Sequence, residues 1–280
     1  MGRTNFTKGI TSQGVPFPGI TSGNVYFVKE GGSDSADGKS IETARASIDS
    51  AMNLVTDGNG DIIYVIGGLS VTTAVTVDKE DTHIIGIPSM DSPTGGRPRL
   101  LATDCDGFII AASKIHIENI RIYVRESAYA GGAPLCGIKV TGTRFHNCIR
   151  NVFIQLDAPT GSHGAMGIGI SGALANSTIE DVMIQGVHTA NSGIATYASG
   201  SSRSTLNVIR NCKLVGLMSI GLNFQISSDD VISGMFFGPG LGTGFRVVGT
   251  TSVVYDYYTA AATAEGATGT SINGDAHALS

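Results

Sequence analysis

The acids with the best spacing for chemistry are Asp104 and Asp106, because residues i and i+2 lie on the same face of a β-strand. Two carboxyl groups held about 5 to 9 Å apart can hydrolyse a glycosidic bond. Both acids also stand just before Gly107, a position that is typical of turn residues. We favour the turn interpretation and expect no catalytic residue in this chain.

Other residues that could bind a metal or catalyse a reaction lack suitable partners in the sequence. Asp34 and Asp37 lie in a loop that does not contain the ligand series of an EF-hand calcium site. His116 and His146 lie in strand-like segments and have no partner at metal-ligand spacing, so we interpret them as structural. Neither a GxSxG motif nor a P-loop is present. We therefore predict a protein without enzymatic activity, metal or cofactor.

Composition excludes several classes of protein. The chain of 280 residues contains 39 glycines, no tryptophan and only 15% charged residues, yet 41% is hydrophobic, which is too apolar for a disordered chain. No apolar run approaches the roughly 20 residues that span a bilayer, and a net charge of −5 offers no basic surface for nucleic acid. Four cysteines without CxxC spacing and the lack of an apolar signal segment predict reduced thiols and folding in the cytoplasm.

Two short units recur along the chain, roughly 23 to 32 residues apart, which is the period of a solenoid. The first unit contains the glycines Gly107, Gly137, Gly167, Gly193, Gly221 and Gly244. The second contains Asn119, Asn151, Asp181 and Asn211. Two repeats that keep the same register predict a parallel β-solenoid, with coils stacked about 4.8 Å apart.

The residues that follow each repeat position predict the core. One position past each glycine stand Phe108, Ile138, Ile168, Ile194, Leu222 and Phe245. One position past each Asn or Asp stand Ile120, Val152, Val182 and Cys212. The Asn and Asp positions fit corners with left-handed backbone geometry, and we expect the glycines to mark a second corner.

The periodicity changes once, before the repeats begin. Apolar residues fall on one face of a helix at Ile48, Ala51, Met52 and Val55. We predict one amphipathic helix over about 43–55, begun by Ser40 or Thr43, that covers an open end of the sheet. The chain then divides into an extended arm (1–24), a β-helical body (25–258) and a tail of small residues (259–280).

The residues that precede each Asn or Asp corner alternate in charge. They are Glu118, Arg150, Glu180 and Arg210. A catalytic interpretation would select Glu118 or Glu180, whereas a ladder of ion pairs that fixes the register between coils explains all four residues. Neighbouring opposite charges on a sheet contribute about 0.2–1 kcal/mol each, so we favour the ladder.

The start of the chain carries a family resemblance. The strand Tyr26-Phe27-Val28, the loop 32–40, the predicted helix and the strand 60–65 resemble the N-terminal cap of right-handed parallel β-helix proteins of the pectate-lyase-like superfamily. The preceding arm, with the segment 5–12, is similar to structural proteins of tailed bacteriophage virions. The resemblance implies an all-β, right-handed parallel β-helix with a capping helix and an extended arm. Members include polysaccharide lyases, trimeric tailspikes and head decoration proteins, so the fold alone does not select a function.

One outward-facing stripe is apolar and bordered by cations. It consists of Arg121, Phe153, Met183, Lys213 and Phe236. An exposed apolar stripe is a liability on a monomer. Either the segments 125–134 or 157–165 cover it, or it is a subunit interface, and the phage resemblance implies three-fold packing of such helices.

The repeats and the resemblance together predict a non-enzymatic structural protein on the outer surface of a phage virion, assembled in the host cytoplasm. The most specific hypothesis is a trimeric capsid decoration (cement) protein whose arm docks on the major capsid protein. The expected anchors are Phe6, Lys8, Ile10 and Phe17. The alternatives are a tailspike or tail-fibre adhesin that binds host polysaccharide, and a polysaccharide lyase or hydrolase.

Overall fold

The computed structural model describes residues 11–12, 15–16, 23–88, 96–128, 131–157, 164–197, 202–259, 271–272 and 277–278. In these ranges one α-helix occurs, α1 (Ile48–Met52), and the remaining regular elements are β-strands. The strands of the first half are β1 (Thr11–Ser12), β2 (Val15–Pro16), β3 (Val25–Lys29), β4 (Asp61–Ile66), β5 (Gly68–Val71), β6 (Val75–Val77), β7 (Thr82–Ile87), β8 (Arg99–Thr103), β9 (Phe108–Ile110), β10 (His116–Glu118), β11 (Arg121–Arg125), β12 (Leu135–Val140) and β13 (Thr143–Phe145).

The other strands follow in the second half of the chain. They are β14 (Cys148–Arg150), β15 (Phe153–Asp157), β16 (Ala165–Ile170), β17 (Ala173–Ala175), β18 (Thr178–Glu180), β19 (Met183–Thr196), β20 (Arg203–Thr205), β21 (Val208–Arg210), β22 (Lys213–Ser228), β23 (Val231–Phe237), β24 (Leu241–Thr250), β25 (Val253–Thr259), β26 (Ser271–Ile272) and β27 (His277–Ala278).

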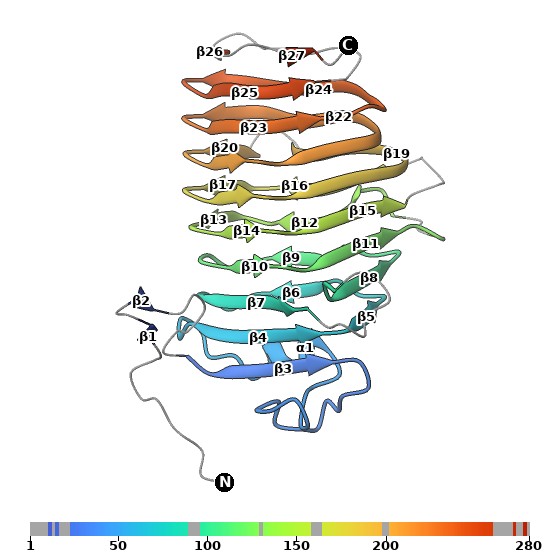
Figure 1. Cartoon of the computed structure of the whole chain (residues 1–280), viewed down its shortest axis with the longest axis vertical. Helices are drawn as coiled ribbons and strands as arrows, with labels where there is room; N and C mark the ends of the chain where they lie inside the picture. The colour runs from blue at the N-terminus through green and yellow to red at the C-terminus, as the bar shows by residue number, and fades with distance from the viewer. Residues whose placement is uncertain are drawn as a thin grey trace.

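The strands stack into a parallel solenoid, with β3 and α1 at the N-terminal end and β25 to β27 at the other end (Figure 1). Within the stack, a strand typically pairs in parallel with the strand one coil before it and the strand one coil after it, as β10 does with β7 and β14. The antiparallel pair β1–β2 is separate from this sheet. The predicted all-β, parallel β-helical fold is confirmed.

The predicted core columns are confirmed residue by residue. Phe108 pairs with Ile138, and the same column continues through Ile168, Ile194, Leu222 and Phe245. All six side chains are fully buried. Since each coil places the same inward position against the next, the core is one continuous apolar cluster along the solenoid.

The Asn and Asp corners are also confirmed. Their φ angles are positive: 58° at Asn119, 53° at Asn151, 54° at Asp181 and 54° at Asn211. Short polar side chains tolerate this left-handed geometry best, which explains why the same residue types recur.

The six repeat glycines are not corners, so that prediction is wrong. They do not have positive φ, and five of them lie within strands. A Cβ on Gly167 would stand 2.6 Å from the carbonyl oxygen of Gly193 and 2.5 Å from the Ile184 Cδ1 atom. Glycine is therefore required by the close approach of one coil to the next, not by a turn.

The helix is shorter than predicted. It begins after Ser47, whose side chain accepts a hydrogen bond from the Ser50 amide, and it does not extend to 43 or 55. Residues 43–45 cannot join the helix because they run alongside β3: the Arg45 amide donates to the Phe27 carbonyl, and Arg45 forms a bridge with Val28. The buried face of the helix, with Ile48, contributes to the core.

The ends of the chain are described only in part. The arm residues Phe6, Lys8, Ile10 and Phe17 lie outside the described residues. In the tail, β26 and β27 pair with β25 and extend the sheet beyond residue 259. No helix among the described residues is long and apolar enough to cross a bilayer.

Candidate functional site

The alternating charges form a ladder across four consecutive coils. Arg150 lies beside Glu118 with an N–O distance of 2.7 Å and faces Glu180 at 3.9 Å. Arg210 pairs with the other side of Glu180 at 2.5 Å. Both glutamates are therefore engaged by arginine, and the predicted ladder is confirmed.

A pair of imidazoles extends the ladder toward the N-terminal end. His116 Nε2 lies 3.2 Å from Glu118 Oε2, and His83 Nε2 lies 3.5 Å from Asp81 Oδ1. The two Nδ1 atoms face one another at 3.4 Å. Burial is the main cause that lowers the pKa of His116, and the His83 and Arg150 charges act in the same direction, while Glu118 opposes them.

The sequence pattern did not reveal this pairing, and His116 had no expected partner. The two histidines are 33 residues apart in the chain but occupy the same register position in adjacent coils. The signal that could have found them is the repeat itself, because residues one period apart are neighbours in a solenoid.

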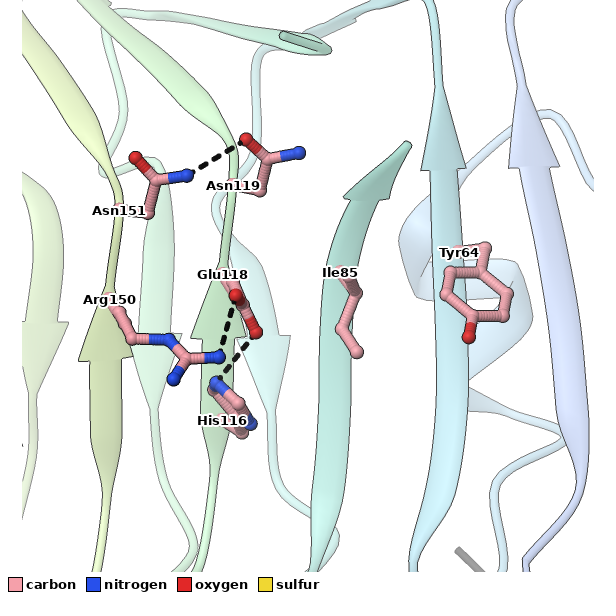
Figure 2. Close-up of a pocket in the computed structure, with 7 residues that line it drawn as sticks. All are labelled: Tyr64, Ile85, His116, Glu118, Asn119, Arg150 and Asn151. Carbon is pink, nitrogen blue, oxygen red and sulfur yellow. Dashed lines mark hydrogen bonds and ion pairs between the residues drawn. The ribbon is translucent and has the colours of Figure 1, made fainter. Parts of the chain in front are cut away.

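These side chains line a cavity of about 300 Å³ on the outer face of β4, β7, β10 and β14 (Figure 2). Its lining consists of Tyr64, Ile85, His116, Glu118, Asn119, Arg150 and Asn151. The amides form a second row in which Asn151 Nδ2 donates to Asn119 Oδ1 and Arg97 donates to Asn151 Oδ1. The cavity thus presents a phenol, an imidazole and a balanced set of charges to solvent.

The predicted pair Asp104 and Asp106 does not form a catalytic pair. Asp104 has a φ of 56° and lies after β8, so the two residues do not share a strand face. Its carboxylate accepts hydrogen bonds from the amides of Ser127 and Ala128. Asp106 accepts from the Cys136 amide and pairs with a lysine at 3.1 Å. Both residues lie in the turn before Gly107, as the turn interpretation predicted, and their carboxylates link this turn to the next coil.

The acids of the N-terminal loop also stabilise local structure. Asp34 accepts hydrogen bonds from the amides of Ala46 and Ser47, which lead into α1. Asp37 accepts from the Lys39 amide. No group of three or more His, Cys, Asp or Glu side chains suited to a metal occurs in the described ranges.

The predicted stripe forms one column across consecutive coils. Its register partners run from Arg121 through Phe153, Met183 and Lys213 to Phe236. The Arg121 guanidinium lies 4.8 Å from the Phe153 ring centroid, and the Lys213 ammonium lies 5.1 Å from that of Phe236. The aromatic residues are half-buried and Lys213 is exposed.

The stripe reaches further than predicted. Tyr258 of β25 pairs in register with Phe236 and is 40% exposed. Further along the strands that carry Met183 and Lys213, Val187 of β19 and Leu217 of β22 are also exposed. The face therefore presents apolar and cationic side chains from β11 to β25. Tyr258 stands two positions after Asp256, whose φ of 51° continues the Asn and Asp corners, but the sequence pattern did not identify it because Gly234 replaces the Asn in the coil between.

The cysteines agree with the predicted reduced state. All four are free, and Cys136 and Cys212 are buried. Burial raises the pKa of each of these two thiols to about 12, so neither is a nucleophile near neutral pH. Cys136 packs outside the main core, against Met166 and the ring of Tyr197.

No protein-family model matches this sequence, and no curated protein sequence matches it significantly. Among solved structures, a rhamnogalacturonan lyase is similar with a TM-score of 0.60 and 15% identity, over 85% of this chain and 68% of that one. A pectate lyase has a TM-score of 0.45 and 14% identity, over 90% of this chain and 78% of its own. The ORF18 protein of Geobacillus virus E2 has a TM-score of 0.46 and 14% identity, over 82% and 58%. The first similarity supports the fold.

Proposed function

We propose that this chain is a non-enzymatic structural protein of a bacteriophage virion, and that three copies pack side by side through the stripe face. The observation that carries the proposal is the continuous column of aromatic and cationic side chains from Arg121 to Phe236. Aromatic residues and arginine are the residue types enriched where proteins associate. A column parallel to the solenoid axis suits packing of parallel rods.

The phage assignment and the decoration role come from the resemblance of the N-terminal segment, with the arm as the part that docks on the capsid. An extended arm can add backbone hydrogen bonds to a sheet edge and order itself on binding. Phe6, Lys8, Ile10 and Phe17 are its proposed anchors, on the outer surface of the particle.

A lyase or hydrolase is the weaker alternative because the acidic side chains that such an enzyme would need are engaged in the ion pairs of the ladder. Both oxygens of Glu118 have partners, Arg150 and His116, and Glu180 is held by two arginines. A carboxylate in such a position is not free to exchange a proton with a substrate. The absence of turnover on acidic polysaccharides is the expected result.

Phe153→Asp tests the interface. We expect the wild-type protein to sediment as a trimer at micromolar concentration and this variant to sediment as a folded monomer, because a carboxylate cannot be buried against an apolar face without a large cost. Phe145→Asp is the matched control, since Phe145 is 41% exposed on β13, away from the stripe. A wild-type monomer would overturn the trimer proposal.

The capsid role has its own test. Deletion of residues 1–24 should abolish co-sedimentation with phage heads and leave the trimer intact. Labelled protein seen at the tail of the particle would contradict decoration and favour the tailspike alternative. That alternative has one observation in its favour, the polar cavity beside Tyr64, and it predicts that a host polysaccharide protects this cavity from modification.

A further inference from the structure

The imidazoles of His83 and His116 form a pair that the proposed structural role does not use. They lie in the same register position of β7 and β10. Their rings meet edge to face, with centroids 5.5 Å apart, and their Nδ1 atoms are 3.4 Å apart. Both side chains are partly exposed, so solvent and small ions can reach them.

The carboxylates beside the rings favour a hydrogen on the nearer ring nitrogen. Asp81 faces His83 Nε2 and Glu118 faces His116 Nε2, and an ionised carboxylate can only accept a hydrogen bond. A hydrogen on each Nε2, toward the neighbouring carboxylate, leaves a lone pair on each Nδ1, although the contact between His116 Nε2 and Glu118 does not have the geometry of a hydrogen bond. Two lone pairs that face one another at 3.4 Å repel unless a proton or a cation lies between them.

We propose that His83 and His116 bind one divalent transition-metal ion, of the zinc class, through their Nδ1 atoms. In tetrahedral coordination with Zn–N bonds of about 2.0–2.1 Å, two nitrogen ligands lie roughly 3.4 Å apart, which is the separation of the two Nδ1 atoms in this protein. A carboxylate on the second nitrogen is the usual arrangement behind a metal-binding histidine, because it orients the ring and raises its basicity.

The surroundings favour a cation and supply the missing ligands. Three carboxylates (Asp81, Glu118 and Glu180) face two arginines (Arg150 and Arg210) around the pair, which leaves one net negative charge. The adjoining cavity of about 300 Å³ gives water access to His116. Because the described residues offer two imidazoles and no third grouped ligand, water must complete the coordination, and the affinity should be lower than that of a closed structural site.

Titration of chelator-treated protein with zinc chloride at pH 7 in a calorimeter tests the site. We expect one ion per chain, with at least a tenfold loss of affinity in His83→Asn and in His116→Asn. The matched control is His188→Asn, because His188 also faces a carboxylate, Asp157 at 3.2 Å, but is not part of the pair. Wild-type protein that binds no zinc, or a His83→Asn variant that binds as tightly as wild type, would overturn the proposal; the first result would mean that a shared proton fills the gap.

Two further measurements keep the test decisive if a histidine variant does not fold. Asp81→Asn retains both ligands and should weaken zinc binding by about tenfold, the usual effect of losing a carboxylate behind a ligand. Protein loaded with cobalt(II) should show the visible absorption bands of a tetrahedral site and no thiolate charge-transfer band. The Cys148→Ser variant should give the same spectrum. This control matters because Cys148 is the next residue in the column after His116. A thiolate band lost in Cys148→Ser would contradict a site made by two imidazoles.

Discussion

Asp230 is an acid inside the solenoid whose charged form is destabilised by burial. It is buried, and its carboxylate accepts hydrogen bonds from the amide of Asn207 at 2.9 Å and from Ser227 Oγ at 2.5 Å. Asn207 in turn accepts from the Ser177 amide, so polar side chains link consecutive coils. Burial is the largest influence on this carboxyl and raises its pKa above 3.8, although the hydrogen bonds oppose it.

Replacement of Asp230 by asparagine should therefore stabilise the protein at neutral pH. A carboxyl whose pKa is raised in the folded state stabilises that state fully below pH 3.8, and the contribution is lost as the pH rises through the raised pKa. The amide keeps an oxygen for Asn207 and can donate to Ser227. We expect Asp230→Asn to have a higher Tm than wild type at pH 7 and the same Tm below pH 3.8.

Thermal unfolding between pH 3 and pH 8 measures this difference. Asp229→Asn is the matched control, because Asp229 is exposed in a left-handed corner, a conformation that asparagine adopts equally well, and its Tm should follow wild type at every pH. A lower Tm for Asp230→Asn at pH 7 would mean that the charge itself is needed for the hydrogen bonds.

The repeat in the sequence predicted residues whose type recurs at one position of the coil. It did not reveal contacts between coils that occur only once. Glu118 and Arg150 were recognised because the same position alternates in charge along the chain. His83 was missed because its column does not repeat a residue type: the residue after His116 in the column is Cys148. Asp104 was placed in a turn correctly, since the glycine that follows is a local signal.

At the scale of the strand, the repeat glycines set how closely coils can approach. Gly167 faces the Gly193 carbonyl, and Gly193 faces the Gly221 carbonyl, so each lacks the space for a Cβ. A sequence pattern reveals that glycine recurs, but positive φ and close packing both require glycine. Only the three-dimensional stacking separates the two causes.

Gly167→Ala should destabilise the protein by about 1–3 kcal/mol, the usual cost of inserting a methyl group into a packed core. The added Cβ would stand 2.5 Å from the Ile184 Cδ1 atom, and the backbone oxygen of Gly193 cannot move aside. Gly132→Ala is the control, because nothing lies within 4 Å of its Cβ position and its φ is not positive. Urea denaturation measures both, and equal midpoints would contradict the packing explanation.

The helix shows that a local sequence pattern does not determine where a helix begins and ends. Ile48, Ala51 and Met52 do face the core, as the period predicted, but the helix ends within five residues. Residues 43–45 have no signal against a helix in the sequence; their pairing with β3 is a long-range interaction. Tertiary contacts override a local preference of this size.

At the scale of the whole molecule, the solenoid is one-dimensional: each coil contacts the coil before it and the coil after it, and the core columns continue from coil to coil. This explains why the fold could be predicted from a repeat. The stripe and the ladder follow from the same geometry, because any outward position that repeats becomes a column on the surface.

Removal of one complete coil should therefore leave a folded, shorter solenoid. Deletion of residues 181–210 joins Glu180 to Asn211, which has the same φ of 54° as the Asp181 it replaces. The Glu118–Arg150–Glu180 ion pairs remain, and Leu214 takes the core position of Ile184, its register partner. We expect a cooperative urea transition with a smaller m value, since less surface is exposed on unfolding.

Deletion of residues 181–195 removes about half a coil and, unlike removal of a complete coil, should prevent folding. It turns inward positions outward in every later coil, because the register of the columns is lost. Circular dichroism and urea denaturation should show an unfolded or aggregated chain. If both deletions fold equally well, the columns do not determine the stacking; if neither folds, stability resides in contacts beyond neighbouring coils, and the one-dimensional account of this molecule is wrong.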